Sequence, residues 1–130
     1  MIVTGDKVAK FVGDKLGFGV FPPWTAMGIE RDGEIIGGVL FNCFEGCDVH
    51  VTVAGKGFGK IFLEKVGYYV YNQLGCLRAT IQTEQEYVIT LSEKLGGKIE
   101  GRKRDHFGKG RDAVIVGILK SEYRFLKKEL

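Results

Sequence analysis

The stretch "VTVAGKGFGKIFLEKVGYYV" (residues 51–70) decides the fold of this chain. It opens with a short β-branched run, which predicts a strand, and ends in an apolar pattern at helical spacing, which predicts a helix. Positions 55–60, between the two, hold three glycines, two lysines and Phe58. Glycine lets the backbone approach a ligand closely, and a helix start beside lysines favours an anion. We therefore predict a strand, a phosphate-binding loop and a helix.

The helix that follows this loop should end at Gly75, a residue type that commonly closes helices. Its predicted apolar face consists of Ile61, Phe62, Val66, Tyr69, Val70 and Leu74. The segment "CLRATIQ" (76–82) then predicts another strand. A strand, a helix and a second strand form a crossover unit, and such units pair their strands in parallel.

The chain before this unit predicts one helix and a meander of strands. Apolar residues at helical spacing up to Leu16 predict a first helix, with Thr4 as its N-cap and Gly17 as its end. Three β-rich runs follow between residues 24 and 53, and Asp32-Gly33 between the first two is a strong hairpin signal. We expect an antiparallel meander of three strands.

The chain after the unit predicts a further helix and a strand pair. The helix lies in "EQEYVITLSEKLGG" (84–97), with Val88, Leu91 and Leu95 on one side. Strands around "KIEGRKR" (98–104) and "DAVIVGIL" (112–119) are joined by a turn-rich segment. The charged tail, residues 120–130, is predicted as a helical turn or a frayed end.

Composition and charge fit one folded domain. The 130 residues are 45% hydrophobic and 27% charged, with only two prolines, which excludes a disordered chain. Nineteen basic against sixteen acidic residues give a net charge of +3. This surplus is too weak to indicate nucleic-acid binding, but it does not repel an anionic cofactor.

Cysteine usage and the amino terminus favour a reducing cytoplasm. The three cysteines are an odd number, and neither a membrane-spanning apolar run nor a signal peptide is visible. Cys43 and Cys47 could suggest a metal pair, but no second pair with zinc spacing exists. We predict buried or half-buried free thiols, no metal site and no membrane contact.

Three phosphate-binding patterns can be tested on the loop. The nucleotide triphosphatase loop needs glycine at 54 and a hydroxyl at 61, where Ala54 and Ile61 stand. The dinucleotide fingerprint finds Lys60 in place of its third glycine. The coenzyme A loop, Q/R-x-x-G-x-G/A, is matched at Gly57 and Gly59, while Ala54 replaces the Gln or Arg. A glycine-rich turn without a ligand stays open as the alternative.

Further motifs extend the third match. In "LSEKLGGKIEGRKR" (91–104), two groups of residues resemble segments of the GNAT superfamily of acyl-CoA N-acyltransferases: Leu91, Glu93, Lys94, Leu95 and Gly96, then Glu100, Gly101 and Arg104. The second group is similar to the "EGxxR" of the branch with ribosomal-protein N-acetyltransferases. "GRDAVIVGILKSEYRFL" (110–126) resembles the ending of a short branch often carried by phages. The resemblance covers about residues 24–119.

The resemblance implies a fold and an activity. The fold is a single GNAT-like domain over residues 1–130 of α+β class, with a mostly antiparallel sheet of about six strands, one parallel splayed pair and three or four helices. The activity is transfer of an acetyl group from acetyl-CoA to a primary amine on a small molecule or protein, in the cytoplasm, or the host cytoplasm if phage-encoded. A homodimer is compatible with it. The alternatives are a non-catalytic interaction domain of the same fold and RNA binding through the lysines and "GRKRD" (101–105).

The resemblance also assigns the cofactor site. Backbone amides at the strand end would serve the acyl carbonyl, and those of the loop the pyrophosphate, while Gln85 stands where relatives have Asn. The predicted cofactor-binding residues are Val51, Val53, Gly55, Lys56, Gly57, Phe58, Gly59, Lys60 and Gln85.

The predicted catalytic residues are His50, Asp48 and Ser92. Asp48, His50 and Thr52 share one face of a strand, for which a solvated outer face is the alternative reason. Histidine has an ordinary pKa of about 6.5 and suits a general base, which Asp48 could orient. Ser92 stands where relatives have the Tyr that protonates the leaving thiolate, and Tyr87 is a second hydroxyl on another face of that helix.

Overall fold

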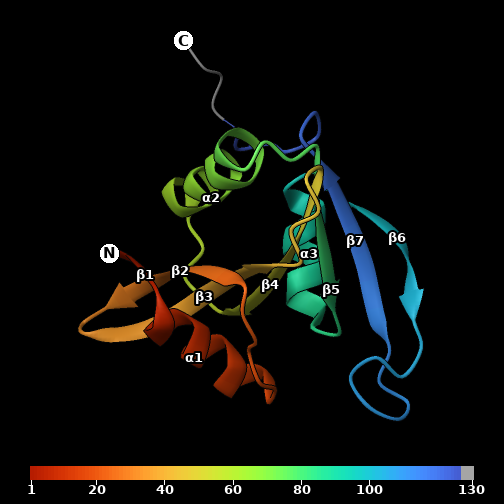
Figure 1. The fold of residues 1–130 in the computed structure, drawn as a ribbon, viewed down its shortest axis with the longest axis horizontal. Coiled ribbons are helices and arrows are strands. Elements are labelled where there is room, and N and C mark those ends of the chain that lie inside the picture. Colours follow the sequence, from red (N-terminus) through yellow and green to blue (C-terminus); the bar gives the residue numbers. More distant parts are fainter. Residues whose placement is uncertain (127–130) are drawn as a thin grey trace.

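The computed structural model describes residues 1–126 and contains a seven-stranded sheet in the order β1-β2-β3-β4-β5-β7-β6 (Figure 1). The elements are β1 (Ile2–Thr4), α1 (Asp6–Leu16), β2 (Trp24–Arg31), β3 (Glu34–Asn42), β4 (Asp48–Gly55), α2 (Lys60–Gly67), the π-helix η1 (Tyr68–Gln73), β5 (Arg78–Thr83), α3 (Glu86–Lys94), β6 (Lys98–Lys103) and β7 (Ala113–Leu119). Within the described residues, no helix combines the length and apolar character needed to cross a membrane.

The strand order confirms the predicted crossover. β4 and β5 pair in parallel, whereas every other neighbouring pair in the sheet is antiparallel. The parallel register covers only three residue pairs, from Asp48↔Arg78 to His50↔Thr80. β4 then runs on to Gly55 and β5 to Thr83 without pairing with each other, so the sheet opens between these two strands.

Helices cover the two faces of the sheet unevenly. α1 packs on β1 to β4, and its Val8 and Val12 are buried with Leu40 and Ala54. α2, η1 and α3 lie on the opposite face, over the core that includes Val51. In Figure 1, α1 lies below β2, β3 and β4 and α2 above them, while β5, β7 and β6 extend to the right.

The start of the chain differs from the prediction. Residues 2–4 form β1 and pair with β2, so Thr4 lies opposite Met27 and does not cap α1. Gly5 occupies the N-cap position without a side-chain hydrogen bond. The backbone groups along the edge of β2 pair with this short strand. A strand of three residues is too short to show the alternating pattern from which a strand is predicted. The end of α1 is as predicted, because Gly17 is left-handed and its N–H donates to the Gly13 carbonyl.

The buried face of the helix after the loop agrees with the prediction at Phe62, Val66 and Val70 and differs from it at Ile61. Ile61 is exposed, whereas Leu63 and Tyr71 are buried. From Tyr68 the helix becomes a π-helix, in which the N–H of Leu74 donates to the Tyr69 carbonyl five residues earlier. A π turn contains more residues than an α turn, so it rotates the following side chains relative to a 3.6-residue repeat.

The tail packs against the domain over its described part. Residues 120–126 form turns, and Tyr123 is buried with its hydroxyl donating to the Leu63 carbonyl at 2.6 Å. The prediction of a frayed end is therefore wrong for residues 120–126. Residues 127–130 lie outside the described chain. The cysteine prediction holds for buried Cys76 but not for Cys43 and Cys47, which are exposed in the β3–β4 connection.

Candidate functional site

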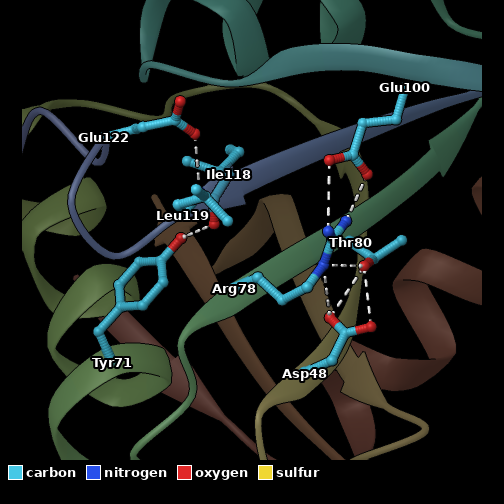
Figure 2. A network of polar contacts seen from close by, with 8 residues as sticks. All are labelled: Asp48, Tyr71, Arg78, Thr80, Glu100, Ile118, Leu119 and Glu122. Carbon is cyan, nitrogen blue, oxygen red and sulfur yellow. Dashed lines mark hydrogen bonds and ion pairs between the residues drawn. The ribbon is translucent and has the colours of Figure 1, made fainter.

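The closed end of the β4–β5 pair is fixed by charged side chains (Figure 2). The Thr80 hydroxyl donates to the Asp48 carboxylate at 2.8 Å, and the Arg78 guanidinium lies 3.7 Å from it. Arg78 also pairs with Glu100 of β6 at 2.5 Å. Hydrogen bonding to Glu100 raises the pKa of Arg78, so this cation stays charged. The network joins β4, β5 and β6 just before the sheet opens.

The open end of the pair is spanned from the start of α3. The Gln85 amide donates to the Val53 carbonyl at 2.9 Å, and the Tyr87 hydroxyl donates to the Gly55 carbonyl. Burial raises the pKa of Tyr87, which keeps its hydroxyl protonated at neutral pH. On the side that faces β5, the end of β4 is therefore bound by side chains from the start of α3, while on its other side it pairs with β3 up to Gly55.

The glycine loop (residues 54–60) is pressed against β3. A Cβ atom on Gly37 would lie 2.1 Å from the Lys56 carbonyl oxygen, and one on Gly55 would lie 2.2 Å from that of Ile36. The Lys56 N–H donates to the Ile36 carbonyl at 2.9 Å. Only glycine allows this approach of two backbones.

Gly59 differs from the other glycines of the loop. Its φ of −85° is open to any residue, and a Cβ atom there would meet nothing within 4 Å. By contrast, Gly55 and Gly57 have φ of 84° and 93°, which glycine tolerates best. Gly59 is the N-cap of α2, and no side chain caps that end. A side chain at 59 would meet neither backbone strain nor a neighbouring atom, and glycine is itself among the residues favoured at an N-cap.

A small cavity lies between the opened strands and the helices. It has a volume of about 40 Å³ and is enclosed mainly by apolar side chains. The predicted site residues Val51, Val53, Phe58 and Ser92 line it. Ser92 is 1% exposed, and its hydroxyl donates to the Val88 carbonyl at 2.7 Å. The serine proton is therefore already engaged inside the helix.

A larger cleft of about 580 Å³ lies on the side that carries α1. The end of α1, β4, β5 and the residues around the β6–β7 connection line it. His50 and Thr52 of the predicted polar row line this cleft and are half-buried. Further polar side chains contribute from around it: Asn42, Gln82, Thr83, Glu84, Gln85, Lys103, His106 and Arg111.

The structure brings some predicted residues together and separates others. His50, Val51, Val53 and Gln85 line one cleft beside the end of β4. Asp48 lies two residues before His50 on the same strand face, but its carboxylate is bound by Thr80 and Arg78. No hydrogen bond between Asp48 and His50 is present in the described chain.

Sequence reasoning missed the charged rim of the cleft. Arg111 hydrogen-bonds both carboxylate oxygens of Glu84, and this hydrogen bonding lowers the pKa of that carboxyl. Lys103 lines the same cleft from the end of β6. The sequence alone indicates only the RNA-binding alternative for "GRKRD" (101–105), because the folded β6–β7 connection is what places Lys103 beside residues of β4 and β5.

Comparisons with known proteins give the fold. Neither family models nor curated sequences match the chain. Among solved structures, a mutant form of the spermidine/spermine N-acetyltransferase SpeG from Vibrio cholerae is 15% identical, with a TM-score of 0.73 over 95% of this chain and 96% of that one. The same enzyme in complex with CoA and spermine is 13% identical, with a TM-score of 0.71 and the same coverage.

A chimera of the Vibrio cholerae spermidine N-acetyltransferase with hSSAT is 20% identical, with a TM-score of 0.63 over 77% of this chain and 70% of that one. Identities this low speak for the fold alone. The fold predicted from the loop and helix motifs is confirmed, with a mixed sheet, one parallel pair and three α-helices. The seventh strand is β1, which the prediction of about six strands lacked. The chain therefore shares its fold with these N-acetyltransferases, as the resemblance in its sequence predicted.

Proposed function

We propose that this protein is an acetyl-CoA-dependent N-acetyltransferase that acts on a primary amine. The observation that carries the proposal is the opening between β4 and β5, with the glycine loop at one end and a polar cleft on the far face. Such an opening lets a thioester held from the helix side reach an amine on the other side of the sheet. The fold shared with enzymes of this activity supports it.

The donor site in this proposal follows the exposed loop and the end of β4. The amides of Gly57, Phe58 and Lys60 and the positive end of α2 would bind the pyrophosphate, with added attraction from the exposed Lys56 and Lys60. The Gly59 N–H donates to the Gly57 carbonyl at 2.9 Å. Amides of Val51, Val53 and Gly55 would bind the pantetheine and polarise the acyl carbonyl. Gln85 would hold the β4 end in register for this, through its bond to Val53.

His50 is the proposed general base. It lines the cleft from the last residue pair before the sheet opens, so its imidazole faces the space where an amine can approach the thioester. The amine nitrogen attacks the acyl carbon, the carbon–sulfur bond breaks, and the imidazole takes the proton that the new amide nitrogen loses. Asp48 would act by fixing β4 against β5, since Thr80 and Arg78 already occupy its carboxylate.

The leaving thiolate has no dedicated acid in this proposal. The Ser92 hydroxyl donates to Val88 and that of Tyr87 to Gly55. The coenzyme A thiolate would take a proton from water in the cleft. A non-catalytic domain that binds coenzyme A is the second candidate, favoured by the engaged Ser92 and by a cavity of about 40 Å³, little more than the volume of one water.

Turnover separates the two candidates. The protein is incubated with acetyl-CoA and a mixed panel of primary amines, and acetylated products are detected by mass spectrometry. This readout avoids thiol reagents, which would react with the exposed Cys43 and Cys47. An acetylated amine that forms only with the protein supports the enzyme. Coenzyme A binding without product across the panel would favour the non-catalytic domain.

A further inference from the structure

The cleft beside His50 carries more positive than negative charge. Lys103 and Arg111 contribute two permanent cations, and Glu84 is the only carboxylate among the described lining residues. His50 and His106 add two imidazoles to the lining, and neither is a carboxylate. A ligand in this cleft therefore meets a cationic rim rather than an acidic one.

The single carboxylate of the cleft is already occupied. The Arg111 guanidinium contacts both Glu84 oxygens, with its Nε donating to Oε2 at 3.1 Å. The two remaining Nη1 hydrogens and one Nη2 hydrogen leave this guanidinium with donors for a further anion. Glu84 thus has little capacity left for a cationic substrate.

Acidic residues near the cleft are engaged as well. Asp105 accepts from the Gly110 N–H at 2.8 Å, and Asp112 accepts from the Asp105 N–H at 3.0 Å and lies 3.8 Å from Arg102. Asp48 is bound by Thr80 and Arg78. Within residues 1–126, no carboxylate forms an ion pair with Lys103.

The end of α1 adds a weaker field of opposite sign. A helix C-terminus carries about half a negative charge, which falls off within a turn. Here the Gly13 carbonyl accepts from the N–H groups of both Gly17 and Phe18, so it is not open to a ligand. Lys103, Arg111 and Glu84 together leave one net positive charge in the cleft, which outweighs this partial charge.

We propose that the acceptor of this enzyme is a primary amine that also carries an anionic group, a carboxylate or a phosphate. Its anionic end binds Lys103 and the unused donors of Arg111, and its amine faces His50. This inference rests on the proposed acetyl transfer and narrows its substrate class. It sets the chain apart from the structural neighbour that was solved with spermine, a polycation.

A matched amine series tests the proposal. Amines of equal chain length that end in a carboxylate, a phosphate, a hydroxyl or a second ammonium are compared by kcat/KM with saturating acetyl-CoA, at several chain lengths. We expect an anionic amine to exceed the alcohol by about two- to fivefold and the diamine by more, in keeping with partly exposed ion pairs. Comparing the amines that end in a carboxylate with those that end in a phosphate identifies which anion the cleft binds.

Charge variants provide the control. Lys103→Gln should lower kcat/KM for the anionic amine about two- to fivefold through KM and leave the alcohol unchanged, and Lys103→Glu should shift the preference toward the diamine. Lys120→Gln removes the same charge from an exposed position that does not line the cleft. This variant should leave kcat/KM unchanged for both the anionic amine and the alcohol. Lys103 is exposed on an edge strand, so these variants should fold.

Two results would overturn the inference. One is a diamine that matches or exceeds the anionic amines in the wild type, and the other is a preference that Lys103→Glu does not alter. Both leave acetyl transfer itself intact. Failure of the proposed function looks different, because then no amine of the series is acetylated at any length.

Discussion

At the residue scale, His50 is the side chain on which the proposed chemistry depends. It lies at the last position where β4 pairs with β5, and it lines the cleft. The carboxylate of Asp48, two residues earlier, is bound by Thr80 and Arg78. The two side chains differ in this way because His50 and Asp48 share one face of the strand but only His50 lies beside the opening. Sequence alone could place both on that face but could not tell which was engaged.

Replacing His50 tests its role as a base. His50→Gln should lower kcat for acetyl transfer by about 10²-fold, because the amine loses the group that takes its proton. The affinity for acetyl-CoA, measured by calorimetry, should stay within about twofold. Thr52→Val, on the same face of β4, is the matched control and should keep most of the rate. A His50→Gln variant with wild-type turnover would remove the histidine from the mechanism.

Two buried tyrosines should make the protein sensitive to alkali. Burial raises the pKa values of Tyr71 and Tyr123 above the ordinary value of about 10, while their hydroxyls donate to carbonyls of Ile118 and Leu63. Their contribution to stability is therefore full below pH 10 and is lost as the pH rises above it. Each should lower the free energy of unfolding by about 1.4 kcal/mol per pH unit there.

Urea unfolding between pH 9 and 11 measures this loss. Tyr123→Phe should flatten the alkaline slope relative to the wild type, after a cost of about 1 kcal/mol at neutral pH for the lost hydrogen bond. Tyr68→Phe removes a hydroxyl from a half-exposed side chain and serves as the control. Equal slopes in all three proteins would show that buried tyrosine does not control alkaline stability.

At the element scale, the glycine loop and β3 form one unit. The loop carbonyl of Lys56 lies where a side chain on Gly37 would be, so the position of the loop depends on a glycine in another strand. The sequence motif identified the loop glycines but gave no role to Gly37, because the contact exists only once β3 and β4 are in register.

Gly37→Ala should therefore disturb the loop from outside it. A methyl group 2.1 Å from the Lys56 carbonyl must push the two backbones apart, at a cost of about 1–3 kcal/mol as for other overpacked sites. Thermal unfolding and acetyl-CoA titration should both show the loss. The comparison is Gly101→Ala, where the nearest atom lies 3.9 Å away. Unchanged stability of Gly37→Ala would mean that the loop is not held by this contact.

Elements with long, regular sequence patterns were predictable from the sequence. Elements that form only because of contacts with other parts of the fold were not. The Asp32-Gly33 hairpin and the crossover carry local signals and are confirmed. β1 is three residues long and exists because β2 offers it an edge. The π-helix that turns Tyr71 inward has no period of its own in the sequence.

At the scale of the whole molecule, the two faces of the sheet divide the proposed work. In the proposal, α2, η1 and α3 lie on the donor side of the sheet, whereas α1 packs on β1 to β4 on the other side (Figure 1). The cleft lies on that second side, beside β4 and β5. The glycine loop was predictable because its residues are contiguous. The cleft was not, since His50, Glu84, Lys103 and Arg111 come together only through folding.

The central claim is that the glycine loop binds coenzyme A, and titration calorimetry with acetyl-CoA tests it most directly. Gly59→Val is the informative variant, since Gly59 has ordinary backbone angles and open space, whereas replacing Gly57 would strain a φ of 93°. Gly101→Val, with similar space in β6, is the control, and thermal unfolding checks that all variants fold. The account predicts micromolar binding to the wild type and Gly101→Val, weakened at least tenfold in Gly59→Val. No binding to the wild type, or equal binding to folded Gly59→Val, would contradict it.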